Sequence, residues 1–335
     1  MRAVLLPGSP PLSDPAAPTL LSAVRRSLPN GWAPMPASDR RTAWRWLGSA
    51  AAVAFVGTDP AYGPRRLAES LALTLLAQTR ACRVALLGVR AEPGRDRPSR
   101  RLARSLAQRV DLLVLADDGS ARAFVDAGSP APLRVGADPI WAGLAEPLPP
   151  TERRDIVIAA VRATDDVGEL REPLQQIASF GLPVVLQPWE RYTGDATQSC
   201  ARLADLLGPA TDVLAPLQDV EDARRRFAAA RLVVAGAPHA LIAAATAETP
   251  FVAADGPGAA RIAGALGQRA SHNGDLPHAL VAALEAAPPS RESVATEVEA
   301  AEEGFRLLRV LLSEGEEGAE ALRGGTRLTP EGWDE

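Results

Sequence analysis

Residues 231–267 read RLVVAGAPHALIAAATAETPFVAADGPGAARIAGALG and contain two strand–turn–helix units in succession. The apolar run 232–235 is short enough for a buried parallel strand, and a Gly and a Pro turn it into a small-residue helix over 238–247. A second strand is predicted over residues 251–254, with another helix after the next turn. In folds of this kind ligands bind where the carboxyl ends of strands meet helix N-termini, so we expect a site at the start of the first helix.

His239 is the titratable side chain in the first turn of that helix. Free backbone N–H groups and the helix dipole favour an anion at this place. An imidazole titrates close to neutral pH and therefore suits proton transfer. The alternative is a structural histidine that caps the end of the strand. The other two histidines are interpreted differently, His272 as a loop residue and His278 as a solvent-facing residue of a helix.

Short apolar strands and amphipathic helices alternate through the rest of the chain, which predicts an α/β fold with parallel sheets and right-handed crossovers. The Pro-rich, polar segment 145–154 interrupts this alternation and is the best linker candidate. We therefore predict Rossmann-like domains over residues 1–147 and 148–289. An apolar stripe predicts one long helix over residues 290–312 that packs across both domains, followed by a flexible tail, 313–335.

The composition and the net charge argue against several classes of function. The chain has 335 residues and a net charge of −5, and all 36 of its basic residues are arginines. This balance argues against a nucleic-acid partner, and the lack of lysine excludes Schiff-base chemistry on that side chain. The two cysteines, Cys82 and Cys200, are expected to be buried free thiols, and no Cys/His cluster predicts a metal site. No signal sequence and no membrane-spanning segment is expected, so the predicted location is the cytoplasm.

Two short matches carry a family resemblance: His-Ala-Leu-Ile from His239, and Pro-Phe-Val from Pro250. In this region the chain resembles the polysaccharide pyruvyl transferases, including those that modify secondary cell-wall polymers. The resemblance is firmest over residues 111–284. The family usually has an arginine two places before the histidine and a lysine in the later turn, and this chain has Ala237 and Gly258 there.

A second landmark of the family is a polar segment after a strand, which here is Asp117-Asp118-Gly119-Ser120. The family often has an arginine at the start of this segment, where Ala116 stands in this chain. Without the resemblance, the segment is an ordinary turn and helix N-cap.

The resemblance implies a GT-B-like arrangement of the two Rossmann-like domains, with the active site in a cleft. It also implies a pyruvyl transferase that moves pyruvate from phosphoenolpyruvate onto a glycan sugar as a cyclic ketal, in cell-wall or surface polysaccharide biosynthesis. Phosphoenolpyruvate is then the donor and no cofactor is needed. The partner is a glycan or lipid-linked glycan acceptor, and a homo-oligomer is possible. His239 is the predicted proton-transfer residue.

Four other residues are predicted to bind substrate. Arg162 follows a strand, where a guanidinium can hold a phosphate or carboxylate; the alternative is a surface arginine paired with a nearby aspartate. Trp189 can stack on a sugar ring or cap the sheet edge, and Asp195 fits the position of a family acid. Arg261, one helical turn beyond Gly258, can replace the missing lysine.

Two further functions fit the same sequence. The missing cations at Ala116, Ala237 and Gly258 are consistent with an inactive family member that acts as a binding or scaffold protein. A GT-B glycosyltransferase that uses a nucleotide sugar is the other alternative, with Glu248 or Asp255 as the acid for the ribose.

Overall fold

The computed structural model describes residues 2–7, 15–27, 32–34, 50–56, 64–79, 81–90, 97–126, 133–254, 256–271 and 275–313. Three features of the sequence lie outside these residues: the turn residue Asp255, the loop residue His272, and the predicted tail from residue 314 onward. Contacts between Cα atoms divide the chain into two compact units. Of the described residues, the first unit takes 2–7, 20–143 and 297–313, and the second takes 15–19 and 144–296.

The first unit is built on a parallel sheet with the strand order β2-β1-β3-β4-β5-β6. In that order the strands are Trp32–Pro34, Arg2–Pro7, Ala50–Val56, Arg83–Val89, Leu112–Leu115 and Leu133–Val135. The described residues of β3, β4 and β5 are almost all buried, because helices cover both faces of the sheet and such strands become continuous apolar runs.

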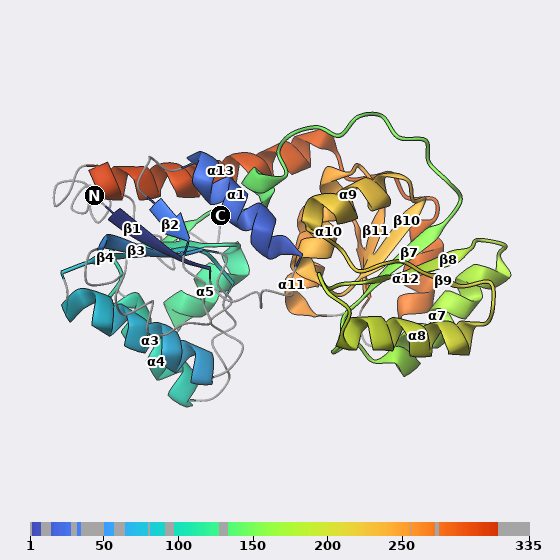
Figure 1. The fold of residues 1–335 in the computed structure, drawn as a ribbon, viewed down its shortest axis with the longest axis horizontal. Coiled ribbons are helices and arrows are strands. Elements are labelled where there is room, and N and C mark those ends of the chain that lie inside the picture. The colour runs from blue at the N-terminus through green and yellow to red at the C-terminus, as the bar shows by residue number, and fades with distance from the viewer. Residues whose placement is uncertain are drawn as a thin grey trace. The chain divides into compact units, whose positions relative to one another are not determined.

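The helices of the first unit are α1 (Ala16–Ser27), whose residues 16–19 count with the second unit, α3 (Pro64–Thr79), α4 (Arg97–Ala107), α5 (Asp118–Asp126) and the short α6 (Ile140–Gly143). Helices α3, α4 and α5 pack on one face of the sheet (Figure 1). Their core includes Phe55, Leu86, Leu106, Leu113 and Phe124. On the other face lies the C-terminal helix α13 (Arg291–Ser313), where a Cβ atom added to Gly304 would lie 3.6 Å from Val114 Cγ1.

The second unit has a parallel sheet with the order β12-β11-β10-β7-β8-β9. In that order the strands are Arg269–Ala270, Phe251–Ala253, Leu232–Ala235, Val157–Val161, Val184–Pro188 and Asp212–Val213. The first strand of the unit, β7, therefore lies in the middle, next to β10 and β8. This change of direction in the strand order is where doubly wound sheets form ligand sites, at the carboxyl ends of the strands.

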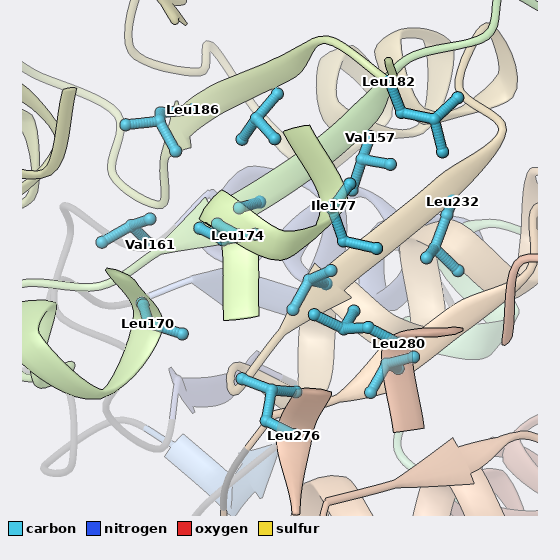
Figure 2. Packing of buried hydrophobic residues seen from close by; sticks show 14 of the residues in the cluster. Val157, Val161, Leu170, Leu174, Ile177, Leu182, Leu186, Leu232, Leu276 and Leu280 are labelled. Carbon is cyan, nitrogen blue, oxygen red and sulfur yellow. The ribbon is translucent and has the colours of Figure 1, made fainter. Parts of the chain in front are cut away.

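The helices of the second unit are α7 (Val167–Ser179), α8 (Asp195–Leu207), α9 (Val220–Ala228), α10 (Pro238–Thr246), α11 (Pro257–Ala265) and α12 (Leu276–Ala283). Figure 2 shows the core between the sheet and helices α7, α8 and α12, where Leu174, Ile177 and Leu280 face Val157 and Leu232. Helices α9, α10 and α11 pack beside one another on the other face (Figure 1). Side chains begin two of these helices: Asp166 accepts a hydrogen bond from the N–H of Gly168, and Asp219 accepts one from Asp222.

The long C-terminal helix α13 runs over Arg291–Ser313, which confirms the prediction of one helix over 290–312. Ser290 begins it, since its hydroxyl accepts a hydrogen bond from the N–H of Ser293 at 3.0 Å. The boundary between the two compact units falls inside this helix, after Thr296. Its apolar stripe is buried at Ala301, Phe305 and Leu308. Three elements were not predicted, namely β2, β12 and α6, because runs of two to four residues carry too little periodicity to be recognised.

Candidate functional site

Three neighbouring strands of the second unit end side by side. Register pairs place Ala235 of β10 opposite Ala160 of β7, and Ala160 opposite Gln187 of β8. The residues that follow these strands therefore lie along one edge of the sheet, about 4.8 Å apart from strand to strand. The sequence-predicted residues His239, Arg162 and Trp189 all follow these strand ends.

His239 lies in the first turn of α10, as predicted, one residue after Pro238. Ala237 is the N-cap residue and makes no side-chain capping bond, so backbone groups alone form this helix terminus. The imidazole is half-buried. Its surroundings combine the positive end of a helix dipole with partial access to solvent, which suits contact with an anionic substrate.

Arg162 follows β7 directly and is held by a single carboxylate. Its Nε donates to Asp165 Oδ1 at 2.7 Å, and Nη2 forms an ion pair with the same oxygen at 2.6 Å. Its backbone N–H donates to Asp165 Oδ2 at 2.8 Å. This ion pair agrees with the alternative interpretation of Arg162, in which the arginine pairs with a nearby aspartate. The side chain still has 28% of its surface exposed, and among the described residues none accepts a hydrogen bond from Nη1.

The guanidinium of Arg162 lies against the backbone of Gly236, at the end of β10. A Cβ atom added to Gly236 would lie 2.6 Å from Arg162 Nη2 and 3.3 Å from Cζ. The glycine is therefore needed for this close approach, since Cβ contacts shorter than 3.0 Å essentially never occur. The guanidinium of Arg162 thus lies against the residue just before Ala237. Ala237 is the position where the family usually has an arginine.

Trp189 is almost completely buried. Its exposed fraction is 7%, and its ring stacks on Phe227 of α9 with centroids 6.4 Å apart and planes at 17°. This burial leaves little ring area for a sugar and favours the alternative, in which the indole closes the end of the sheet.

Asp195 is exposed in the first turn of α8, but its neighbour in the loop, Glu190, is the acid that organises this region. The Glu190 carboxylate is 8% exposed and accepts hydrogen bonds from the N–H groups of Gly194 (2.8 Å), Ala196 (3.2 Å) and Thr197 (3.0 Å) and from the Thr197 hydroxyl. Sequence reasoning chose Asp195 because it sits in the expected position. No sequence signal marks Glu190, because only the fold of the loop brings its carboxylate to the start of α8.

Cys200 lies under this loop, in α8. Burial, with a smaller contribution from the negative charges of Glu190 and Asp165, raises the pKa of its thiol to about 12. The thiol is therefore protonated at neutral pH and serves as a small apolar side chain, as the sequence predicted for both cysteines.

Arg261 is half-buried in the second turn of α11, and Gly258 lies in the first turn of the same helix. Helix α11 follows β11, which is next to β10 in the sheet. Arg261 is thus one strand position away from the end of β10, on the side opposite to Arg162.

In the first unit, the second landmark of the family forms a helix start. Asp117 accepts a hydrogen bond from the N–H of Ser120 at 2.7 Å, which is the N-cap geometry of the alternative interpretation. After β6, Asp138 binds the N–H of Ile140 at 3.1 Å and pairs with Arg90 at 3.3 Å. Ala116, where the family often has an arginine, is buried at the end of β5.

A pocket of about 410 Å³ lies elsewhere in the second unit, at the C-terminal end of α10. It is lined by the Pro-rich segment 147–151 together with Arg153, Ala228, Thr246, Ala247, Glu248 and Arg291. The residues predicted for pyruvyl transfer, namely His239, Arg162, Trp189, Asp195 and Arg261, do not line it. Glu248, weighed as a ribose ligand, instead pairs with Arg291 at 2.7 Å.

Over the described ranges, His, Cys, Asp and Glu side chains form no group of three that could hold a metal ion. None of the helices in that part of the chain is both long and apolar enough to cross a membrane.

Solved structures of UDP-GlcNAc 2-epimerases and of HepE are similar to nearly the whole chain. The UDP-GlcNAc 2-epimerase of Methanocaldococcus jannaschii, in complex with UDP-GlcNAc and UDP, matches with a TM-score of 0.63 and 11% identity, over 93% of this chain and 99% of that one. Anabaena HepE in complex with UDP and glucose matches with a TM-score of 0.57 and 14% identity, over 97% and 100%. The UDP-GlcNAc 2-epimerase of Neisseria meningitidis has a TM-score of 0.59 and 10% identity, over 94% and 100%.

These similarities define the class of protein: an α/β protein of the GT-B-like class, with two parallel sheets and a long C-terminal helix, as the sequence predicted. The family model described as polysaccharide pyruvyl transferase matches residues 9–255. The chain therefore belongs to the polysaccharide pyruvyl transferase family, which is a family of transferases. No curated protein sequence matches the chain.

Proposed function

We propose that the protein transfers pyruvate from phosphoenolpyruvate to two hydroxyl groups of one glycan sugar, with release of phosphate. The observation that carries this proposal is the position of Arg162, which Asp165 holds against Gly236 beside the helix start that bears His239. Together these groups offer a cation, a helix N-terminus and a proton-transfer residue at one strand edge, which suits a small substrate with a phosphate and a carboxylate.

The chemistry assigns a role to each group. One sugar hydroxyl adds to C2 of the enolpyruvyl group while the methylene carbon takes a proton, and the C2–O bond to phosphate then breaks. The second hydroxyl adds to the same carbon, and its proton leaves with the phosphate. His239 would move the proton between the hydroxyl and the methylene carbon, and Arg162 would hold the anionic donor.

Under this proposal Arg162 also replaces the arginine that the family usually has at the position of Ala237. Its guanidinium reaches the backbone next to Ala237 from the neighbouring strand, so a cation is present although residue 237 has none. Under this proposal Arg261 contributes a second positive charge from the other side of β10. The acceptor would be a glycan or lipid-linked glycan, and the location the cytoplasm.

A nucleotide-sugar transferase is the second candidate, because the similar structures of the epimerases and of HepE contain UDP or UDP-sugars. Their identity to this chain is 11% and 14%, so the likeness extends to the fold alone. A scaffold function without catalysis is the third.

The test is acceptor-dependent phosphate release. The protein is incubated with phosphoenolpyruvate and cell-wall or surface glycans, and free phosphate and ketal-linked pyruvate are measured together. We expect equal amounts of both products. Hydrolysis of UDP-sugars instead would favour the second candidate, and no turnover of either donor would favour the scaffold.

A further inference from the structure

The loop after β8 presents an exposed aromatic ring at the same strand edge. Tyr192 is 60% exposed, whereas Trp189, three residues earlier, is buried against Phe227. The other exposed aromatic side chain among the described residues is Phe180, at the end of α7 and hence near the opposite edge of the sheet. A tyrosine offers a large, rigid contact surface with few rotatable bonds, which is why it is favoured at binding surfaces.

A buried acid, Glu190, links the two ends of the loop that carries Tyr192 by hydrogen bonds, and we call these contacts the Glu190 brace. The Glu190 carboxylate begins the loop and accepts hydrogen bonds from Gly194, Ala196 and Thr197, where the loop enters α8. A Cβ atom on Gly194 would lie 3.1 Å from Glu190 Oε2, so the glycine permits this closure. Charge-assisted hydrogen bonds of this kind are stronger than neutral ones and fix the loop backbone.

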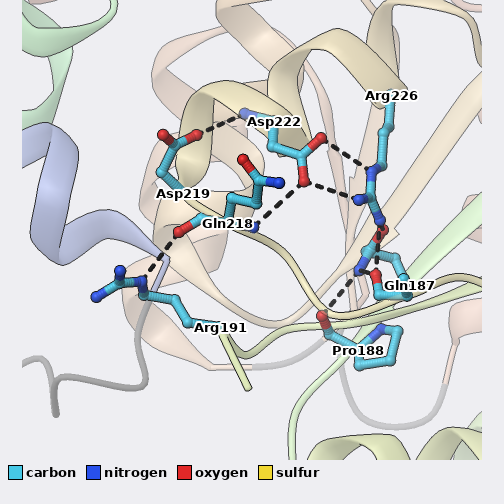
Figure 3. Close-up of polar contacts among 8 residues, drawn as sticks. Gln187, Pro188, Arg191, Gln218, Asp219, Asp222 and Arg226 are labelled. Carbon is cyan, nitrogen blue, oxygen red and sulfur yellow. Dashed lines mark hydrogen bonds and ion pairs between the residues drawn. The ribbon is translucent and has the colours of Figure 1, made fainter. Parts of the chain in front are cut away.

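Arg191 fixes one face of the tyrosine ring. Its guanidinium carbon lies 5.2 Å from the ring centroid, and its Nε donates to the carbonyl of Gln218 at 2.9 Å. Figure 3 shows how that carbonyl is held in turn: the N–H of Gln218 binds Asp222, and Asp222 pairs with Arg226.

Arg226 completes this network by binding the side chain of Gln187 in β8 at 2.7 Å. The amide of Gln187 donates to the carbonyl of Pro188 at 2.9 Å, at the end of the same strand (Figure 3). The network therefore starts and ends on β8 and positions the loop relative to the sheet.

The strand order places the start of the loop that carries Tyr192 next to the end of β7, which Arg162 follows. Strand β8 is next to β7, which carries Arg162, and β7 is next to β10, which precedes His239. With about 4.8 Å between strands, the β8 loop begins about one strand spacing from Arg162 and two from the start of α10.

We propose that Tyr192 forms the acceptor subsite, with the exposed face of its ring stacked on the apolar C–H face of a pyranose. Arg191 and the Glu190 brace position the tyrosine and do not themselves need to touch the sugar. This inference rests on the proposed function for the identity of the acceptor, but sugar binding at Tyr192 can be measured without phosphoenolpyruvate.

The experiment is saturation-transfer NMR with the methyl pyranosides of glucose, galactose and mannose as probes, on the wild type, Tyr192→Ala, Tyr192→Phe and Phe180→Ala. We expect at least one pyranoside to bind the wild type, with an affinity about tenfold weaker in Tyr192→Ala, since stacking on an aromatic ring contributes on this scale. Tyr192→Phe keeps the ring and Phe180→Ala removes an equally exposed aromatic at the opposite edge, so both should bind as the wild type does.

Equal sugar affinity in the wild type and Tyr192→Ala, or no binding of any pyranoside, would overturn the proposal. Displacement of the sugar by UDP alone would overturn it as well, because the ring would then serve a nucleotide base. Titration of the same variants with phosphoenolpyruvate separates the two proposals. Loss of donor binding in Tyr192→Ala would contradict the acceptor role, while Tyr192-dependent sugar binding without donor binding would leave the subsite and refute the pyruvyl donor.

Discussion

Arg162 and Gly236 depend on each other, because the guanidinium occupies the space that any side chain at residue 236 would fill. Asp165 Oδ1 holds the guanidinium from one side while Oδ2 accepts from the backbone N–H of Arg162, and the backbone of Gly236 lies on the other side of the cation. An arginine held in this way loses little rotamer entropy when it binds an anion. A substitution at either Arg162 or Gly236 therefore tests the proposed donor site directly.

Gly236→Ala should weaken phosphoenolpyruvate binding about tenfold or more and change the free energy of unfolding by less than about 1 kcal/mol. The new Cβ would meet the end of a flexible side chain, so the guanidinium moves while the fold persists. Gly264→Ala in α11 is the matched control, since nothing lies within 4 Å of its Cβ position. Calorimetric titration and urea unfolding of both variants measure the two effects. Unchanged donor affinity in Gly236→Ala would show that Arg162 is not part of the site.

His239→Gln should lower the rate of pyruvyl transfer about 10²–10⁴-fold, the usual contribution of a general acid–base, with an unchanged thermal midpoint. The half-buried imidazole makes this substitution sterically mild. Steady-state rates and thermal unfolding of the same preparation check it. If the variant unfolds while its folded fraction keeps normal specific activity, His239 is structural.

At the scale of single elements, helix α13 brings an acid into a charged environment. Glu297 is half-buried, and burial is the main cause that raises the pKa of its carboxyl above 4.5, with Arg90 opposing the rise and Asp117, Asp138 and Asp118 adding to it. The folded protein therefore holds this proton more tightly than the unfolded chain. The wild type has its full stability from this group below pH 4.5 and loses part of it as the pH rises through the raised pKa.

Glu297→Gln removes that loss, so its free energy of unfolding should exceed the wild-type value at pH 7 and approach it toward pH 4. Urea unfolding at several pH values provides the comparison. Glu302→Gln, at an exposed position of the same helix, is the control and should follow the wild type throughout. A constant difference between Glu297→Gln and the wild type at every pH would mean that burial of the charge plays no part.

The elements also show how far the sequence could predict the fold and the site. Period and length were sufficient for the strands of both sheets that exceed three residues, and for α13 to within one residue at each end. Period and length could not predict the burial of Trp189, because it depends on stacking against Phe227 of helix α9. Glu190 was passed over for Asp195 for the same reason: the fold of a loop decides which of two nearby acids reaches a helix start.

At the scale of the whole molecule, the negative net charge means that binding of an anionic donor depends on where individual cationic groups lie. A chain with a net charge of −5 does not attract a small anion by its overall field, so any donor site must come from individual arginines and helix termini. The family assignment rests on residues 9–255 and the GT-B-like class on similarity across nearly the whole chain. The choice between a pyruvyl donor and a nucleotide sugar rests on which anion the Arg162 site binds.

Calorimetric titration with phosphoenolpyruvate, and separately with UDP, of the wild type and Arg162→Leu tests that choice most directly. The wild type should bind one phosphoenolpyruvate per chain. Arg162→Leu should lose about tenfold or more in affinity, because a charge-assisted contact is removed. UDP should neither bind at this site nor compete for it. Binding of UDP by the wild type with no heat from phosphoenolpyruvate, or equal phosphoenolpyruvate affinity in both proteins, would contradict the account.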